Sequence, residues 1–288
     1  MFAQVKTRRY NSCYVPFATV GSNMYFIILS TVLFIAVNGR AVDKIKLEEA
    51  DNGYLFEGDM VMTKDRIDTA LNGGVSSNSY ALKKDTRYRW NNGIVPFVLH
   101  TSVRNKVLNG VGVKGPTERA IRKAMEAWEK KTCIKFVERT DQRDFIEFFD
   151  AGFGKCYSHV GKTGGHQRIS LGFGCFTTGV AIHEIGHALG LWHEQSRPDR
   201  DDYVEILWNN IKEANKHNFR KYSHNIVDSR GSPYDYDSIM HYEWNAFSKI
   251  PLVQRTIRSK QKGKSFGQRS HISVQDAWQI NKYYDCKI

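Results

Sequence analysis

The chain has few prolines and few cysteines, with 6 Pro and 5 Cys in 288 residues. Because it also lacks any short repeat, the collagen-like and low-complexity classes are excluded. Only one long apolar run occurs, which excludes a polytopic membrane protein. The remaining composition is that of a globular protein. It has 41% hydrophobic and 25% charged residues, which is enough for a sizeable core in one or two domains.

Acidic residues are the scarcer charged class, and the formal net charge is +12. This balance occurs in proteins that bind nucleic acid or anionic surfaces, and also where it serves only solubility. The densest basic run contains a single aromatic residue, Phe266, so stacking of bases is not indicated. We interpret the run as a solvated loop and predict no nucleic-acid partner; its residues are Arg255, Arg258, Lys260, Lys262, Lys264 and Arg269.

The apolar run covers residues 24–37 and carries no charge. Basic residues precede it and small residues follow it, with Gly39 placed for cleavage, which is the pattern of a secretory signal peptide. The run is shorter than the ~20 residues that span a bilayer, and a signal anchor is the alternative. We expect a leader and signal peptide over residues 1–39 and a secreted, extracellular protein with no stable membrane span. The pattern leaves the start open between Met1 and Met24.

Four of the five cysteines lie outside this leader. An even number in a secreted chain favours two disulfides over four buried thiols, and three pairings are open. The four residues are Cys133, Cys156, Cys175 and Cys286.

Residues 40–84 differ in composition from the rest of the chain, because they are polar and lack Cys, Trp and His. They end in a Gly/Ser/Asn-rich stretch followed by Lys83 and Lys84, which is typical of a flexible surface segment with a processing site.

The body, residues 85–288, mixes strand and helix patterns and becomes irregular beyond Arg197. Pro96 suggests an edge position or a bulge in its strand. Pro116 suits the first turn of a helix, and Ser273 can cap another with Asp276. The order predicts an α+β fold with an upper lobe (85–193) and a lower lobe (194–288). The predicted strands are residues 94–100, 133–139, 145–149 and 166–171, and the predicted helices are residues 116–131, 179–191 and 273–284.

The central motif is His183-Glu184-Ile185-Gly186-His187. Histidines at i and i+4 lie on one face of a helix, so both imidazoles can bind one Zn²⁺ ion. Glu184 projects about 100° away from His183, which places a general base beside the metal without making it a ligand.

A third histidine, His193, follows six residues after His187. On a continuing helix it would point away from the metal, so the chain must turn after His187. Gly190 is where a left-handed helix end can form, because glycine has no Cβ. Three histidines and one open position are the pattern of a catalytic zinc site.

The segment Ser238-Ile239-Met240-His241-Tyr242 lies at a distance downstream that fits the Met-turn of zinc proteases with the extended histidine motif. Met240 would then form an apolar floor beneath the ligands, and Tyr242 could reach the metal region from below.

With these motifs the chain resembles the astacin family of zinc endopeptidases. The resemblance rests on HEIGHALGLWHEQSRPDRDDYV (183–204), SIMHY (238–242), EKKTCIKFVER (129–139), CYSHVGK (156–162) and FGQRSHIS (266–273), which together cover nearly all of residues 88–288. Glu194, directly after the third histidine, separates astacins from other metzincins. We expect no EGF or CUB module after the catalytic motifs.

The resemblance implies a two-lobed metzincin fold with a twisted sheet, antiparallel at its edge, and one Zn²⁺ per catalytic domain. It implies that His183, His187 and His193 bind the metal and that Glu184 is the general base. Tyr242 would be a switchable zinc ligand that stabilises the oxyanion. We expect a monomer that acts on protein or peptide substrates, with a catalytically silent, secreted astacin-like binding protein as the alternative.

The resemblance also implies the disulfides Cys133–Cys286 and Cys156–Cys175, and a substrate-binding edge strand at residues 166–171. Arg269 would lie at the pocket for the residue after the cleaved bond and favour an acidic residue there.

Phe56-Glu57-Gly58-Asp59 matches the FxGD motif of astacin propeptides, so residues 40–84 are expected to be a propeptide. Asp59 would ligate zinc in the zymogen. A cut near residues 80–89 would then release an α-amino group that meets Glu194.

Overall fold

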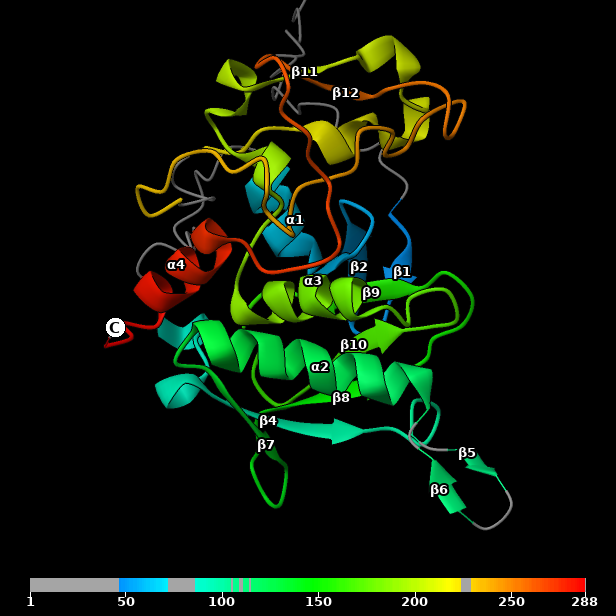
Figure 1. The fold of residues 1–288 in the computed structure, drawn as a ribbon, viewed down its shortest axis with the longest axis vertical. Helices are drawn as coiled ribbons and strands as arrows, with labels where there is room; N and C mark the ends of the chain where they lie inside the picture. The colour runs from blue at the N-terminus through cyan, green and yellow to red at the C-terminus, as the bar shows by residue number, and fades with distance from the viewer. Residues whose placement is uncertain are drawn as a thin grey trace, which may run out of the picture. The chain divides into compact units, whose positions relative to one another are not determined.

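The computed structural model describes residues 47–71, 86–104, 106–108, 111–113, 115–223 and 229–287, and the side chains of 106–113 are not included (Figure 1). The predicted signal peptide and the predicted processing region around Lys83 and Lys84 lie outside these residues. Within the described part, no helix is both long enough and apolar enough to cross a membrane.

One eight-stranded mixed sheet organises the described chain, in the order β1-β2-β3-β9-β10-β8-β4-β7. Strands β10, β8, β4 and β7 are parallel neighbours, whereas β9 runs antiparallel to β10. The strands are β1 (Glu49–Ala50), β2 (Gly53–Phe56), β3 (Met60–Met62), β4 (Ile94–Leu99), β7 (Lys135–Glu138), β8 (Phe145–Phe149), β9 (Cys156–His159) and β10 (His166–Leu171).

Four α-helices, six short 3₁₀ helices and two small sheets complete the described elements. The α-helices are α1 (Lys64–Leu71), α2 (Pro116–Lys131), α3 (Thr178–Leu189) and α4 (Val274–Tyr283). The small sheets pair β5 (Lys106–Leu108) with β6 (Val111–Val113) and β11 (Val204–Ile206) with β12 (Ile257–Ser259). The α+β prediction is confirmed.

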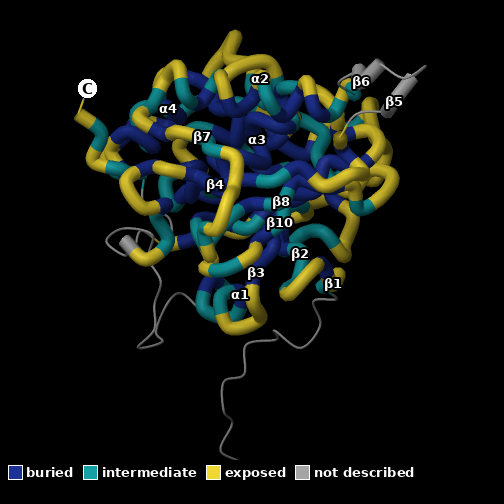
Figure 2. Tube along the Cα trace, turned by 90° about the horizontal axis from the view of Figure 1, so that it is seen from below, coloured by how far each residue is buried: buried dark blue, intermediate teal, exposed yellow. Residues whose placement is uncertain are grey.

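The main core lies between the sheet and the two helices α2 and α3 (Figures 1 and 2). Alternate residues of β4 and β8 face it, while Ile121, Ala124, Met125 and Trp128 form the apolar stripe of α2 that the periodicity predicts. Ten of the twelve residues of α3 are buried. The helix that carries the zinc motif is therefore held on several sides.

Two disulfides tie distant parts of the chain together, and they are the pairs that the resemblance implies. Cys133 bonds to Cys286, which is 153 residues away, and Cys156 bonds to Cys175. In the chain-entropy model a loop of the first size stabilises the fold by roughly 5 kcal/mol.

Helix α4 begins with the predicted capping box, in which Ser273 and Asp276 bond each other's backbone N–H groups. The carboxylate of Asp276 also accepts from Ser238 Oγ at 2.6 Å and from the N–H of Ile239 at 2.9 Å. One acidic side chain thus anchors both the C-terminal helix and the Met-turn segment.

Two expectations about the sheet need correction. Residues 166–171 are not an edge strand, because β10 lies between β9 and β8. Within the predicted catalytic domain the two edge strands are β7 and β9. The sequence of β9, CYSH, alternates too weakly between apolar and polar residues to be predicted as a strand. Pro96 lies in an internal strand, but β4 pairs with β8 only from Phe97 onward, so the missing N–H falls where β4 has one partner.

Residues 47–71 are more regular than their composition indicates. Strand β3 extends the sheet by pairing in parallel with β9, and β2 and β1 continue it outward. The side chains of Phe56, Met60, Met62 and Ile67 are buried against residues from the end of the chain, including Tyr283. This part of the predicted propeptide therefore shares a core with the catalytic domain.

Candidate metal centre and active site

Three histidines and one aspartate converge on a single point. The ligand atoms of Asp59, His183, His187 and His193 all lie within 4.8 Å of one another. Oxygens of Asp59 lie 3.2 Å from Nε2 of His183, 3.7 Å from Nε2 of His187 and 3.2 Å from Nε2 of His193. Neighbouring ligand atoms on a tetrahedral zinc are about 3.3 Å apart when the bonds are near 2.0 Å.

The turn that returns His193 to this point is formed by Gly190. Helix α3 ends at Leu189, two residues before the predicted end at residue 191. Gly190 has a φ of +115°, in the left-handed region that the sequence predicts for it. The N–H of Leu191 bonds to the carbonyl of Gly186 at 3.0 Å, which closes the helix end. An added Cβ at Gly190 would also meet the Tyr283 ring at 2.8 Å, so glycine is required for both conformation and space.

The outer nitrogen of each imidazole has an acceptor. Nδ1 of His183 donates to the carbonyl of Ile239 at 2.8 Å, and Nδ1 of His187 donates to the carbonyl of Leu191 at 2.8 Å. Nδ1 of His193 lies 2.7 Å from a Glu57 carboxylate oxygen. With the proton on Nδ1, the lone pair of each Nε2 faces the shared centre.

The centre contains buried polar atoms with no hydrogen-bond partner. Among them are Nε2 of His187 and Oδ1 of Asp59, which both face the point of convergence. Buried polar atoms are nearly always paired, so these two indicate a missing positive partner. Three imidazole nitrogens and a carboxylate oxygen fit a Zn²⁺ ion.

The electrostatics of the histidines reflect burial and the nearby carboxylates. Burial, with a smaller contribution from Arg269, lowers the pKa of His183 to about 4. Burial also acts to lower the pKa of His193, but Asp59 and Glu57 outweigh it and raise that pKa to about 9. Neutral imidazoles are the form that binds a metal, so His183 is already in its ligating state at neutral pH.

Glu184 lies on the same helix and is 1% exposed. Burial, followed by the negative charge of Asp59, raises the pKa of its carboxyl group well above the ordinary value. One of its oxygens, Oε2, has no hydrogen-bond partner. It is therefore a buried carboxyl group with one unpaired oxygen, on the helix that carries two of the converging histidines.

Met240 and Tyr242 lie beside the helix and the histidines of the motif. The Met240 sulfur would be only 2.8 Å from a Cβ at Gly186, which places Met240 directly under the helix of the motif. The Tyr242 ring centroid is 4.6 Å from that of His193. Its hydroxyl donates to the carbonyl oxygen of Glu57, so Tyr242 bonds to the predicted propeptide here and not to the metal-binding atoms.

Glu194 is buried, as is its partner Arg197. The Glu194 carboxylate accepts from Arg197 at 3.0 Å and from the N–H of Asp235 at 2.8 Å. Burial raises the pKa of Glu194 to about 8, although Arg197 acts in the opposite direction.

Arg269 sits at the start of α3, where the carbonyl oxygen of Arg269 would be 1.6 Å from a Cβ at Gly179. Its guanidinium donates to the carbonyls of His241 at 3.0 Å and Gln268 at 2.9 Å. Burial lowers its pKa, while Asp59, Glu243 and Glu184 raise it. This cation therefore lies close enough to Asp59 and Glu184 to interact with their charges, and its place in a substrate pocket stays a prediction.

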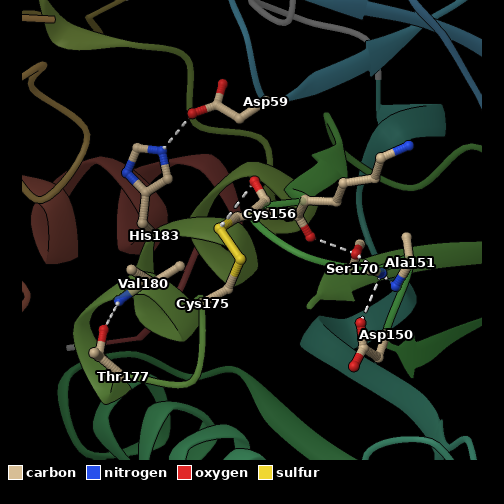
Figure 3. The surroundings of a disulfide bond; sticks show 12 residues. Asp59, Asp150, Ala151, Cys156, Ser170, Cys175, Thr177, Val180 and His183 are labelled. Atoms are coloured by element: carbon tan, nitrogen blue, oxygen red, sulfur yellow. Dashed lines mark hydrogen bonds and ion pairs between the residues drawn. A yellow bond between two sulfur atoms is a disulfide. The ribbon is translucent and has the colours of Figure 1, made fainter. Parts of the chain in front are cut away.

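The turn between β2 and β3 delivers Asp59 to the histidines. Figure 3 shows Asp59 facing His183, with the Cys156–Cys175 disulfide and the Thr177 cap of α3 below it. The carbonyl of Asp59 accepts from the N–H of Ser158 at 2.8 Å, so the turn is also bonded to edge strand β9.

Glu57 is the site residue that the sequence does not reveal, because it occupies the variable position of FxGD. Its carboxylate contacts His193 and accepts from Ser196 Oγ at 2.8 Å. The only available signal was a second carboxylate two residues before Asp59.

Comparison with known proteins agrees with this geometry. The family model described as "Astacin", which represents a family of peptidases, matches residues 82–285. This chain belongs to the astacin family. The members it resembles are named as zinc metalloproteinases. The resemblance inferred from the motifs is confirmed.

Two astacins of Caenorhabditis elegans are among the similar proteins. Zinc metalloproteinase nas-30 is 39% identical over 80% of this chain and 30% of its own length. Zinc metalloproteinase nas-6 is 36% identical over 85% of this chain and 67% of its own length. The chain therefore spans less than a third of the first relative and about two thirds of the second.

A solved structure carries the same fold. High choriolytic enzyme 1, a hatching enzyme zinc-protease from Oryzias latipes, is 37% identical, with a TM-score of 0.62. The match covers 70% of this chain and 97% of that chain.

Proposed function

We propose that this chain is the latent precursor of a secreted zinc endopeptidase that hydrolyses protein or peptide substrates. The convergence of three imidazole Nε2 atoms with a carboxylate from another part of the chain carries the proposal. Membership of the astacin family supports the same conclusion.

His183, His187 and His193 would hold one Zn²⁺ ion in the catalytic domain. The bound metal would supply a Lewis acid that polarises a peptide carbonyl and lowers the pKa of a water molecule. The acceptors on the Nδ1 atoms orient the rings, and Met240 and Gly186 pack beneath them.

Glu184 would act as general base: it takes a proton from the attacking water and passes it to the leaving amine. Its burial and its unpaired oxygen support this role, because a base with a raised pKa holds a proton more readily. The Tyr242 hydroxyl would donate to the oxyanion that develops on the substrate carbonyl.

Residues 40–84 would be the propeptide that keeps the enzyme latent, and residues 85–288 the catalytic domain. Asp59 lies where the fourth ligand of the metal would be, beside the three histidines. Strand β3 pairs with β9 and so covers the edge that β9 would otherwise expose. A substrate that adds a strand to this sheet would need the same edge. We therefore expect an extended substrate to bind along β9, antiparallel to it. This replaces the expectation that residues 166–171 bind the substrate.

Activation would follow a cut near residues 80–89. The new α-amino group would insert near Glu194, whose carboxylate borders a cavity of about 30 Å³ lined also by Gly190, Trp192 and Arg197. Secretion is supported by the signal-peptide pattern of residues 1–39 and by the two disulfides, which are typical of oxidising compartments.

The test is a casein digest with the secreted protein, before and after proteolytic removal of the propeptide, with and without a zinc chelator. We expect activity only after processing, abolished by the chelator and restored by Zn²⁺. N-terminal sequencing of the secreted and processed forms would locate both cuts. Digestion that persists in the chelator would contradict the zinc mechanism.

The alternative of a catalytically silent astacin-like protein is not favoured, because Glu184 is present and all three histidines are present and lie together. A processed, zinc-loaded protein that cleaves neither casein nor a peptide library would support it.

A further inference from the structure

The β2–β3 turn presents two carboxylates, and both reach the same imidazole. Asp59 lies 3.2 Å from Nε2 of His193, while Glu57 lies 2.7 Å from Nδ1 on the opposite side of the ring. The third histidine is therefore held between two acidic side chains of the predicted propeptide.

Both carboxylate oxygens and the backbone carbonyl of Glu57 are bonded. Its second carboxylate oxygen accepts from Ser196 Oγ, and its backbone carbonyl accepts from the Tyr242 hydroxyl. The side chains of Glu57 and His193 are both 0% exposed. Charge-assisted hydrogen bonds in such a dry environment are among the stronger polar interactions in proteins.

The backbone of Glu57 is in a conformation that a glutamate rarely adopts. Its φ is +54°, in the left-handed region, and Gly58 beside it has a φ of +92°. Glycine or asparagine would adopt this region at lower cost. A strained residue at a functional site is expected only where its side chain makes contacts that compensate for the strain.

We propose that Glu57 is a second latch of the propeptide that works without the metal. Asp59 contacts the Nε2 atoms that would bind the metal. Glu57 bonds to Nδ1 of His193, on the opposite side of that ring, and to the hydroxyl of Tyr242. The proposal rests on the proposed function in one respect, that residues 40–84 form an inhibitory propeptide.

The latch has a consequence that separates it from the role of Asp59. In the zinc-loaded precursor Asp59 would also be a ligand of the metal, and that part of its binding is lost when zinc is removed, while its contacts with His183 and His193 are left. The bonds of Glu57 to His193, Ser196 and Tyr242 involve only protein atoms. The turn should therefore stay docked in the zinc-free precursor because of Glu57.

Hydrogen–deuterium exchange of the intact precursor, zinc-loaded and zinc-free, tests this directly. The measured quantity is the exchange rate of the amides in residues 53–62. The variants are Glu57→Gln, which removes the charge, and Glu57→Gly, which removes the side chain and relieves the backbone. Glu49→Gln is the matched control, because Glu49 is an exposed glutamate of the same segment.

We expect both Glu57 variants to exchange about tenfold or more faster than the parent in the zinc-free precursor, as for loss of a buried charged hydrogen bond. Glu49→Gln should match the parent. If the side-chain contacts of Glu57 did not stabilise the docked turn, Glu57→Gly would slow the amide exchange of residues 53–62, because glycine adopts a positive φ at lower cost. The proposal is wrong if both Glu57→Gly and Glu57→Gln exchange at the parental rate or more slowly in the zinc-free precursor.

Ser196→Ala provides a milder variant that removes one of the bonds and leaves the turn sequence intact. It should accelerate exchange in the same residues by a smaller factor, and parental exchange in this variant would count against the latch. Amides of β4 and β8 report whether each variant is folded. Failure of the proposed function would appear in a different measurement, because the processed protein would then show no cleavage that a chelator abolishes. Amide exchange of the precursor would still report on the Glu57 contacts.

Discussion

The sheet segment (residues 86–193) and the loop segment (residues 194–287) are held together by different interactions. In the sheet segment, ladders between strands and two long helices satisfy most backbone groups. In the loop segment, buried side chains bond to the backbone directly. Arg200 donates to the carbonyls of Gln195 and Phe219, and Asp276 accepts from the N–H of Ile239.

The difference explains where function and stability lie. In the sheet segment, backbone bonds leave the site side chains such as Glu184 free to do chemistry. In the loop segment, a single charged side chain supplies hydrogen bonds to backbone carbonyls that a helix or a strand would otherwise supply. These bonds are needed because buried carbonyls must be paired. Substitutions should therefore have opposite consequences in the two segments.

The largest expected effect is on catalysis and comes from the sheet segment. Glu184→Ala should lower peptidase activity of the processed enzyme about a thousandfold or more, because a general base is removed. Zinc content and thermal stability should stay near the parental values, since Glu184 is not among the converging ligand atoms. Metal analysis that shows zinc loss in this variant would overturn the assigned role.

The largest effect on stability should come from the loop segment. Arg200→Met leaves two buried carbonyls without a donor and should lower the free energy of unfolding by about 2–4 kcal/mol. Urea unfolding of the precursor measures it. Arg258→Met is the control, because the Arg258 side chain is 60% exposed and its ion pair should contribute about 1 kcal/mol or less. Equal losses in the two variants would remove the contrast between the segments.

The β2–β3 turn of the predicted propeptide contacts both segments, and Asp59→Ala should weaken latency. Loss of a charged ligand should raise the activity of the unprocessed precursor about tenfold or more towards a quenched peptide. Asp65→Ala changes an exposed aspartate of the same propeptide and should leave the precursor silent. If the Asp59 variant is equally silent, the block lies elsewhere.

Arg269 joins the loop segment to the first turn of α3, and we expect its substitution to change the cleavage specificity as well as to remove two bonds to backbone carbonyls. Cleavage-site profiling of the processed enzyme should show enrichment of Asp or Glu directly after the cut. Arg269→Ala should remove that enrichment and lower kcat/KM for acidic peptides about tenfold or more. Enrichment that survives the substitution would exclude Arg269 from the pocket.

The smallest effect is a pH dependence within the sheet segment. Burial is the main cause that lowers the pKa of His159 on β9. As pH falls below about 6.5, the unfolded chain binds a proton that the folded chain does not, so stability falls. His159→Gln should reduce the loss between pH 7 and pH 5, by at most about 1.4 kcal/mol per pH unit. Parallel stability curves for parent and variant would contradict this.

Periodicity predicted the sheet segment because each regular element there has one apolar face. Helix α2 and strands β8 and β10 have the expected bounds, and α4 has its expected cap. Strand β9 was missed because Tyr157 and Ser158 carry no clear alternation. Strands β1–β3 were missed because their apolar residues become buried only against the catalytic domain.

The sequence by itself determined the zinc motif, the turn at Gly190 and the FEGD motif at residues 56–59, because these depend on local spacing and on glycine geometry. Tertiary structure decided which strand is the sheet edge, since strand order depends on long-range pairing. It also decided the contacts of Glu57 and the anchoring by Arg200 and Asp276. Those contacts join residues more than a hundred positions apart, or depend on burial that no local pattern encodes.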